Sequence, residues 1–182
     1  MESAVAAERA VLVTFLDDAR AGVVANLADV PSALLSEPLV SSGASLLGII
    51  KHLAHLERWW FAYTFAGLDV EFPWTDDDPD ADWRVERGET ARRVLALYDA
   101  ECQRSRTVVA AATLDDIAAR PSRTAHPVAL RWVLLHMIAE TSRHAGHADL
   151  LRQLIDGESS PPPCASPRPS PSDFWLNGQP EV

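Results

Sequence analysis

Apolar residues recur along this chain at intervals of three and four positions, and the strict alternation typical of strands is nearly absent. The pattern predicts an all-α protein. Proline-containing breaks separate the apolar-periodic segments, and a glycine follows two of them. The helices are expected at about Ser3–Ala28, Ser45–Ala66, Val85–Ala112 and Val128–Ile155.

Each expected helix has an apolar face and recognisable ends. Ser45 suits an N-cap, and Gly67 and Gly157 stand where a helix C-terminus is expected. In the first helix we expect the buried face to carry Val11, Phe15, Ala19 and Val23, with Leu12, Leu16 and Leu27 beside them. In the third we expect it to carry Val94, Tyr98, Cys102, Ser105 and Val109.

Four long helices of this kind predict a four-helix bundle over residues 1–157, in which binding sites are built from side chains between the helices. The connections 29–44 and 67–84 are long enough for crossovers as well as hairpins, so the topology stays open. Residues 158–182 form a Pro/Ser-rich tail with an apolar tip at Phe174–Leu176.

Composition narrows the classes of partner. The 182 residues include 26 acidic and 16 basic side chains, giving a formal net charge of −10. Nucleic acids and anionic membranes are poor partners for such a surface. The most apolar stretch, Leu46–Phe65, is interrupted by charged residues and cannot span a membrane. Cys102 and Cys164 form no disulfide framework, and the start resembles no signal peptide, so we expect a cytoplasmic protein.

Candidate metal ligands gather on the second and fourth helices. His136, Glu140 and His144 follow one another at intervals of four, along one stripe of a helix. Glu140 and His144 could reach one cation, with His52 as the natural third ligand from a neighbouring helix. Such a set suits Zn²⁺ or another first-row divalent metal and leaves positions open for water or substrate. Ordinary histidines with ordinary hydrogen bonds are the alternative.

Other catalytic templates are missing from the sequence. It has no HExxH motif, and neither Glu57 nor Glu140 has a histidine three residues later, as a ferritin-like dimetal bundle requires. It also lacks a GxGxxG, a P-loop and a GxSxG motif. The sequence therefore gives no support to nucleotide cofactors or serine-hydrolase chemistry.

Three segments carry a family resemblance: ERAVLVTFLDDAR, SLLGIIKHLAHLERWWF and LRWVLLHMIAETSRHAGHADLLRQLIDG. Together they resemble the DinB-like superfamily over residues 8–157. Within it the chain is most similar to the actinobacterial mycothiol transferase-like branch, and it is related to the mycothiol-dependent maleylpyruvate isomerases. The resemblance implies a DinB-like four-helix bundle.

The resemblance also implies a ligand set. Many DinB-like proteins have one histidine on the second helix and an HxxxH pair on the fourth. Here Glu140 replaces the first histidine of the pair and His144 matches the second. This departure from the three-histidine pattern looks like the His, Glu, His set of the maleylpyruvate isomerases. The implied ligands are His52, Glu140 and His144, holding zinc or alternatively nickel or manganese.

Neighbouring polar residues have smaller expected roles. We expect His136 to be a second-shell or core residue and His147 to border the pocket. His55 could line the same cleft, although a surface or interface position is favoured. We expect Glu57 and Arg58 to be solvated or paired with another helix. The acidic run Asp76–Asp82 is expected to be a solvated loop, Trp59–Phe65 to supply core and interface aromatics, and Cys102 to be a small buried hydrophobe.

The leading hypothesis for the function is a metal-dependent thiol S-transferase or isomerase that acts on a low-molecular-weight thiol and an electrophile. The thiol class, mycothiol, comes from the resemblance. A hydrolase that uses metal-bound hydroxide is one alternative. A non-catalytic binding or scaffold bundle is the other, with the tail docked on its own bundle or on a second copy in a homodimer.

Overall fold

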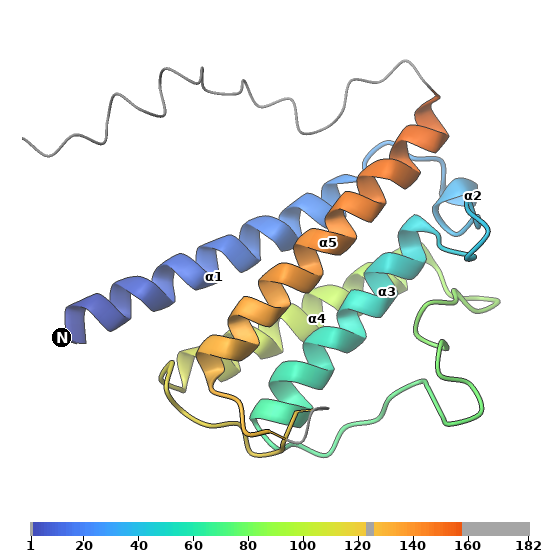
Figure 1. The fold of residues 1–182 in the computed structure, drawn as a ribbon. Coiled ribbons are helices and arrows are strands. Elements are labelled where there is room, and N and C mark those ends of the chain that lie inside the picture. The colour runs from blue at the N-terminus through green and yellow to red at the C-terminus, as the bar shows by residue number, and fades with distance from the viewer. Residues whose placement is uncertain (1, 123–125, 158–182) are drawn as a thin grey trace, which may run out of the picture.

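The computed structural model describes residues 2–122 and 126–157, which are helical and contain no strand (Figure 1). The predicted all-α bundle is confirmed, while the expectations for the tail fall outside the described residues. No helix in these ranges is long and apolar enough to cross a membrane. The elements are α1 (Glu2–Ala25), α2 (Ser32–Leu35), α3 (Leu46–Glu57), the π-helix η1 (Arg58–Phe65), α4 (Ala91–Ala110) and α5 (Leu130–Asp156).

The predicted helix ends are largely confirmed. The Ser45 hydroxyl accepts a hydrogen bond from the Gly48 amide at 3.1 Å and caps α3. Gly67 and Gly157 have φ angles of 70° and 78°, the left-handed region that favours glycine after a helix. The second predicted helix, however, is α3 followed by η1, whose wider turns begin at Arg58.

The structure differs from the prediction at the start of the third helix and by one additional short helix. The third helix begins at Ala91 and not at Val85, because Gly88 adopts a φ of 93° and Thr90 then caps the helix through a hydrogen bond from the Arg93 amide. The one-turn helix α2 was not expected in the connection after α1. Its four residues are too few for a periodic pattern to emerge.

Ion pairs and hydrogen bonds between helices define the topology that the sequence left open. Contacts join Glu8 to Arg131 and Asn26 to Asp149, so α1 and α5 run parallel. Lys51 pairs with Glu89 and Arg58 with Glu101, so α3 and α4 also run parallel. Parallel neighbours need a connection that returns along the bundle. Residues 66–90 make that return along the side of the bundle (Figure 1).

The buried face of α1 differs from the prediction. Val11 and Phe15 are 53% and 61% exposed, whereas Leu16, Arg20 and Val23 are buried. The helix is rich in alanine and carries apolar residues on more than one side, so periodicity alone does not identify its inner face. In α4 the five predicted inner residues are all buried, as expected.

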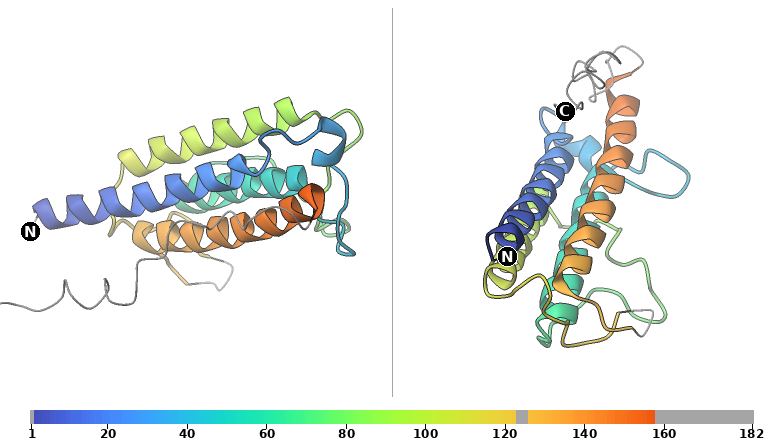
Figure 2. Two further views of the ribbon diagram at one scale, coloured as in Figure 1. Left: turned by 90° about the horizontal axis from the view of Figure 1, so that it is seen from above. Right: turned by 60° about the vertical axis from the view of Figure 1, so that its left-hand side comes forward.

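The apolar core has two halves separated by a polar level. One half includes Val23, Leu53 and Tyr98, and the other includes Leu16, Phe61 and Val109. Between these positions along the helices lie the buried polar residues Arg20, Glu57, Ser105, Thr141 and His144. The four long helices lie alongside one another over this level (Figure 2).

Candidate active site between α3, α5 and the connection 66–90

The returning connection is seated directly on α3. A Cβ atom at Gly48 would overlap the carbonyl oxygen of Trp83, so this approach requires glycine. The Lys51 ammonium donates to the carbonyl oxygen of Arg84 at 2.7 Å and pairs with Glu89 at 2.8 Å. One face of α3 thus holds the connection in place, and it carries Gly48, Lys51 and His52.

His52 is fixed by two residues of this connection. Its Nδ1 atom lies 2.7 Å from Oδ2 of Asp82, and its ring stacks on Trp83 with 3.8 Å between ring centroids. A carboxylate only accepts hydrogen bonds, so Nδ1 carries a proton, and in the neutral imidazole the lone pair then lies on Nε2. The side chain is therefore held in one tautomer and one orientation.

Glu140 and His144 face the same region from α5. Oε2 of Glu140 lies 3.7 Å from Nε2 of His144, and the ring of His144 is centred 5.0 Å from that of His52. On its other side, Nδ1 of His144 lies 3.4 Å from Nδ1 of His147. Burial, with smaller contributions from neighbouring positive charges, lowers the pKa of His144 to about 4. We call His52, Asp82, Glu140 and His144 the histidine site.

The predicted ligand set is not tested by these distances. Among residues 2–122 and 126–157, no group of three or more His, Cys, Asp or Glu side chains is arranged so that it could hold a metal ion. The donors nevertheless fit a divalent cation in kind, with two imidazoles and one carboxylate. Asp82 on Nδ1 of His52 is the outer partner that a ligating histidine usually has.

Two clefts meet at the histidine site, and Trp83 and Asp80 line both of them. The larger cleft measures about 940 Å³ and includes His144 and His147. The smaller measures about 610 Å³ and includes His52 and Glu140. Trp83 and Asp80 therefore border both cavities next to the histidine site.

The remaining histidines have mixed outcomes. His147 lines the larger cleft. His136 lines the smaller one and stacks on Trp132, with 4.9 Å between ring centroids. The favoured surface position of His55 is wrong, because the residue is 5% exposed and its ring lies edge-on to Trp74. Burial and then the positive charge of Arg58 lower the pKa of His55 to about 4.

Asp82 is the residue that the sequence analysis missed. The expectation of a solvated acidic loop is wrong here, since Asp82 is 5% exposed and bonded to His52. A tryptophan immediately after it, in an otherwise charged connection, was the signal available. An indole is seldom left in water, so Trp83 indicates that this part of the connection docks on the bundle.

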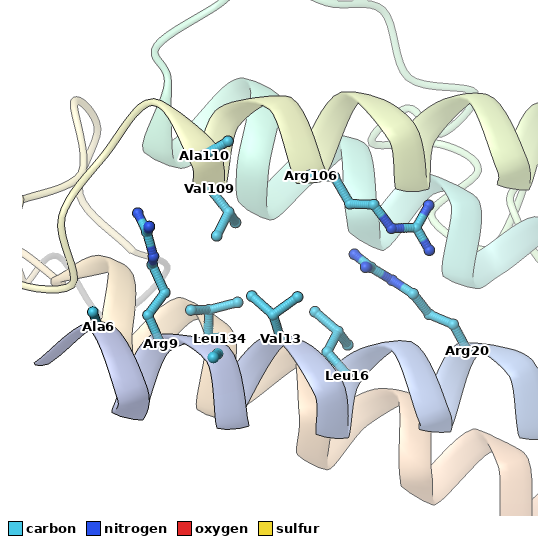
Figure 3. A pocket seen from close by; sticks show the side chains of 10 residues that line it. Ala6, Arg9, Val13, Leu16, Arg20, Arg106, Val109, Ala110 and Leu134 are labelled. Carbon is cyan, nitrogen blue, oxygen red and sulfur yellow. The ribbon is translucent and has the colours of Figure 1, made fainter. Parts of the chain in front are cut away.

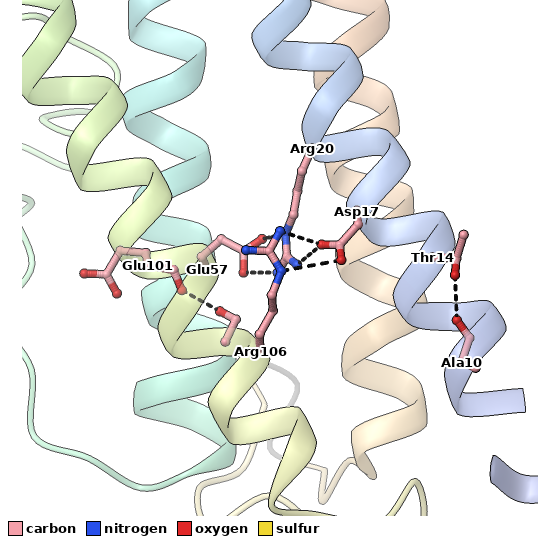
Figure 4. A network of polar contacts seen from close by, with 8 residues as sticks. Ala10, Thr14, Asp17, Arg20, Glu57, Glu101 and Arg106 are labelled. Atoms are coloured by element: carbon pink, nitrogen blue, oxygen red, sulfur yellow. Dashed lines mark hydrogen bonds and ion pairs between the residues drawn. The ribbon is translucent and has the colours of Figure 1, made fainter. Parts of the chain in front are cut away.

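A second polar cluster lies on the opposite side, between α1, α3 and α4 (Figure 4). Arg20 makes two hydrogen bonds to the carboxylate of Glu57, at 2.9 and 2.6 Å, and one to Asp17 at 2.8 Å. Arg106 also bonds to Asp17, at 2.9 Å. We call these four residues the ion-pair network. Of the two expectations for Glu57, solvation or pairing, pairing is confirmed.

A cavity of about 350 Å³ lies beside this network, between α1 and α4 (Figure 3). It is lined by apolar side chains and by Arg9, Arg20 and Arg106. Each arginine already has an acceptor, since Arg9 donates to the carbonyl oxygen of Ala112 at 3.2 Å. Nearby Cys102 is buried as expected, and burial, together with the charge of Glu57, raises the pKa of its thiol to about 12. Among the described residues that line this cavity, none carries a thiol, hydroxyl, imidazole or carboxylate.

The fold and the site define a helical bundle with a histidine-containing cleft built by a crossover connection. A family model described as mycothiol-S-transferase matches residues 11–157. The chain therefore belongs to the mycothiol S-transferase family, within the DinB-like group, and the predicted family is confirmed. Searches among curated proteins and among solved structures find no match.

Proposed function

We propose that the protein transfers the sulfur of a mycothiol-type thiol to an electrophile, with a divalent metal held by His52, Glu140 and His144. The observation that carries the proposal is the position of His52, fixed by Asp82 beside His144 where two clefts meet. The thiol class is supported by the family. The ligand set rests on the chemistry of the donors.

The proposed reaction balances without an oxidant or reductant. The sulfur of the thiol attacks an electrophilic carbon that bears a leaving group, and a carbon–sulfur bond forms. The bond to the leaving group X breaks, and its electron pair departs with X. The proton of the thiol then joins X, so that HX is released. A thiol is mostly protonated at neutral pH, and only the thiolate is a good nucleophile. A bound divalent cation would supply the charge that favours the thiolate.

The chain's own residues orient the imidazole of His52 and keep the neighbouring side chains largely buried. Asp82 and Trp83 hold the imidazole of His52 in one orientation, with its Nε2 lone pair available. His144 is buried, and Trp83 also contacts its ring edge-on, with 5.2 Å between centroids. The side chains of His144 and Glu140 are only 8% and 17% exposed, and low exposure strengthens the electrostatic interactions between them.

Metal content tests the ligand set. The full chain, purified without chelators or a histidine tag, is analysed by mass spectrometry as isolated and after reloading with Zn²⁺, Ni²⁺ or Mn²⁺. We expect about one ion per chain in the wild type and its loss in His52→Ala, Glu140→Ala and His144→Ala. His126→Ala, which removes an exposed loop histidine, is the matched control and should retain the metal. A wild type that binds none of the three metals would overturn the ligand set.

Thiol consumption tests the reaction. The chain is incubated with mycothiol and a set of electrophiles that includes epoxides, halides and unsaturated acids. We expect loss of free thiol together with formation of an S-conjugate, or an isomerised acid if the thiol leaves again. Hydrolysis of the electrophile without thiol loss would identify a hydrolase instead. No turnover of any pair would favour a binding bundle.

A further inference from the structure

The two clefts that meet at the histidine site differ in what lines them. Trp83 lines both of them, and its ring stacks on His52 and meets His144 edge-on. His144 belongs to the larger cleft, whereas His52 and Glu140 belong to the smaller. A molecule in either cleft can therefore approach the site without entering the other.

The smaller cleft has a wall of indole rings. Trp59, Trp60, Trp74 and Trp83 all line it. Trp59 and Trp60 are consecutive residues of η1, and a π-helix places more residues in each turn, so neighbouring side chains diverge less than in an α-helix. Trp74 is held by a stacked Phe72 at 4.4 Å between ring centroids and lies 5.9 Å from Trp59. The indole rings favour a planar group, and the same cleft also presents the carboxylates of Asp80, Asp82 and Glu140.

The larger cleft has a different lining. Its hydrogen-bonding groups include those of Ser42, Arg84, Arg143 and His147, which we call its polar edge, and Leu151 is among the apolar residues that line it. Its volume of about 940 Å³ exceeds the 610 Å³ of its neighbour. Mycothiol is a cysteine derivative that carries two polyhydroxylated rings, so it requires both the greater space and the donors.

We propose that the two clefts are separate substrate subsites, with the thiol in the larger and a planar aromatic or unsaturated electrophile in the smaller. This assignment rests on the proposed thiol transfer. Trp83 is the partition that lets both substrates reach the histidine site together. The indole wall then determines which electrophiles are accepted, and the polar edge determines which thiols are accepted.

Binding of two unreactive probes tests the partition. Titration calorimetry of the full chain uses S-methyl mycothiol, whose sulfur is blocked, and 1,3-dinitrobenzene, which lacks a leaving group. We expect each probe to bind with the same dissociation constant when the other is saturating. Competition between them, or failure of either to bind, would overturn the proposal.

Two variants assign each probe to a cleft. Trp59→Ala should weaken dinitrobenzene about tenfold and leave S-methyl mycothiol unchanged, since it removes an aromatic contact. Leu150→Trp should do the reverse, because this exposed α5 residue lines the larger cleft and a bulkier ring fills it. Trp59→Phe, which retains a ring, should restore most of the dinitrobenzene affinity. Loss of S-methyl mycothiol in Trp59→Ala would place the thiol on the indole wall and overturn the assignment.

Failure of the two-subsite proposal can be distinguished from failure of the proposed thiol transfer. Neither probe reacts, so binding does not depend on turnover. If both probes bind together but the wild type does not couple mycothiol to 1-chloro-2,4-dinitrobenzene, thiol transfer to this electrophile fails while the two subsites stand. If coupling occurs but the probes compete, the partition fails and the proposed function stands.

Discussion

The ion-pair network and the histidine site lie at the same polar level of the bundle, yet they use their charges in opposite ways. In the network, both carboxylate oxygens of Glu57 and the guanidinium of Arg20 are satisfied by each other and by Asp17. In the histidine site, Asp82 occupies one nitrogen of His52 and leaves the other ring nitrogen available. Side chains that bond one another stabilise the fold, whereas those with a free lone pair beside a cleft can bind a ligand.

The difference has a topological cause. The network joins helices to one another, with partners on α1, α3 and α4. The histidine site draws two residues from a connection that returns along the bundle because α3 and α4 are parallel. A loop can present a carboxylate to one side of a histidine and leave a cleft on the other. Two packed helices close that space.

The largest expected effect comes from breaking the network. Glu57→Ala should lower the free energy of unfolding by about 3–5 kcal/mol, because it leaves the buried Arg20 cation without its main partner. Urea denaturation measures this loss. The double variant Arg20→Met, Glu57→Leu should recover most of the stability, since apolar side chains can replace a buried pair. A single-variant loss below about 1 kcal/mol would show that Arg20 finds solvent, contrary to its burial.

The next effect concerns His55, a buried histidine that joins neither cluster. Its Nδ1 atom has no hydrogen-bond partner among the described residues. Burial, then the charge of Arg58, lowers its pKa from 6.5 to about 4, so the folded protein keeps it neutral while the unfolded chain takes up a proton. The stability it contributes is complete above about pH 6.5 and is lost as the pH falls toward 4.

A comparison of unfolding in urea at several pH values isolates this contribution. Between about pH 6.5 and pH 4, protonation of His55 should lower the free energy of unfolding of the wild type by up to roughly 3 kcal/mol. His55→Leu lacks this contribution, so its free energy of unfolding should fall less over the same range. His144, whose pKa is lowered in the same direction, remains in both proteins and cancels in the comparison. Parallel pH profiles for the two proteins would contradict the assignment.

Asp82→Asn tests the orienting role in the histidine site. An amide can still contact Nδ1 of His52 but no longer provides a charged acceptor, so we expect metal affinity to fall about 10–100-fold. Competition with a chelator of known affinity measures the change. Asp77→Asn, an exposed position of the same connection, is the control and should have no effect. Equal affinity in the Asp82 variant and the wild type would remove Asp82 from the site.

These clusters also mark where prediction from the sequence succeeds. Local signals identified the cap at Ser45, the helix end at Gly67 and the buried face of α4, because each depends on residues within a few positions. Helical spacing and the family resemblance together singled out His52 and His144 as candidates, and their rings lie 5.0 Å apart.

What the sequence did not predict depends on distant partners. Asp82 is buried because the connection returns over α3, and the parallel helix pair that requires this path is held by contacts between residues far apart in the sequence. Phe15 faces outward because the inner face of α1 is turned toward Glu57, which lies 37 positions beyond Arg20. Charged residues in the interior are the hardest to predict. Burial of a charge is tolerated only when a partner lies beside it, and that partner can be far away in the sequence.

The smallest expected effect concerns Asp17. It tests whether the ion-pair network acts as one unit, or as a buried pair of Arg20 and Glu57 with a more exposed pair of Asp17 and Arg106 beside it. Burial alone would raise the pKa of Asp17, but hydrogen bonds from Arg106 and Arg20 outweigh it and lower the pKa. Asp17 therefore stabilises the fold above about pH 4, and this contribution is lost as the pH falls through its lowered pKa. Because its side chain is 35% exposed, Asp17→Asn should cost less than about 1 kcal/mol at pH 7.

Urea denaturation of Asp17→Asn and the wild type at pH 7 and pH 3 measures this difference, which should shrink at the lower pH. Arg106→Gln, which removes the other half of the exposed ion pair, should give a similar small loss. If Asp17→Asn instead destabilised the protein as much as Glu57→Ala, the four residues would act as a single buried unit. The contrast between mutually paired charges and a histidine site with an available nitrogen would then include Asp17 and Arg106 as well as Arg20 and Glu57.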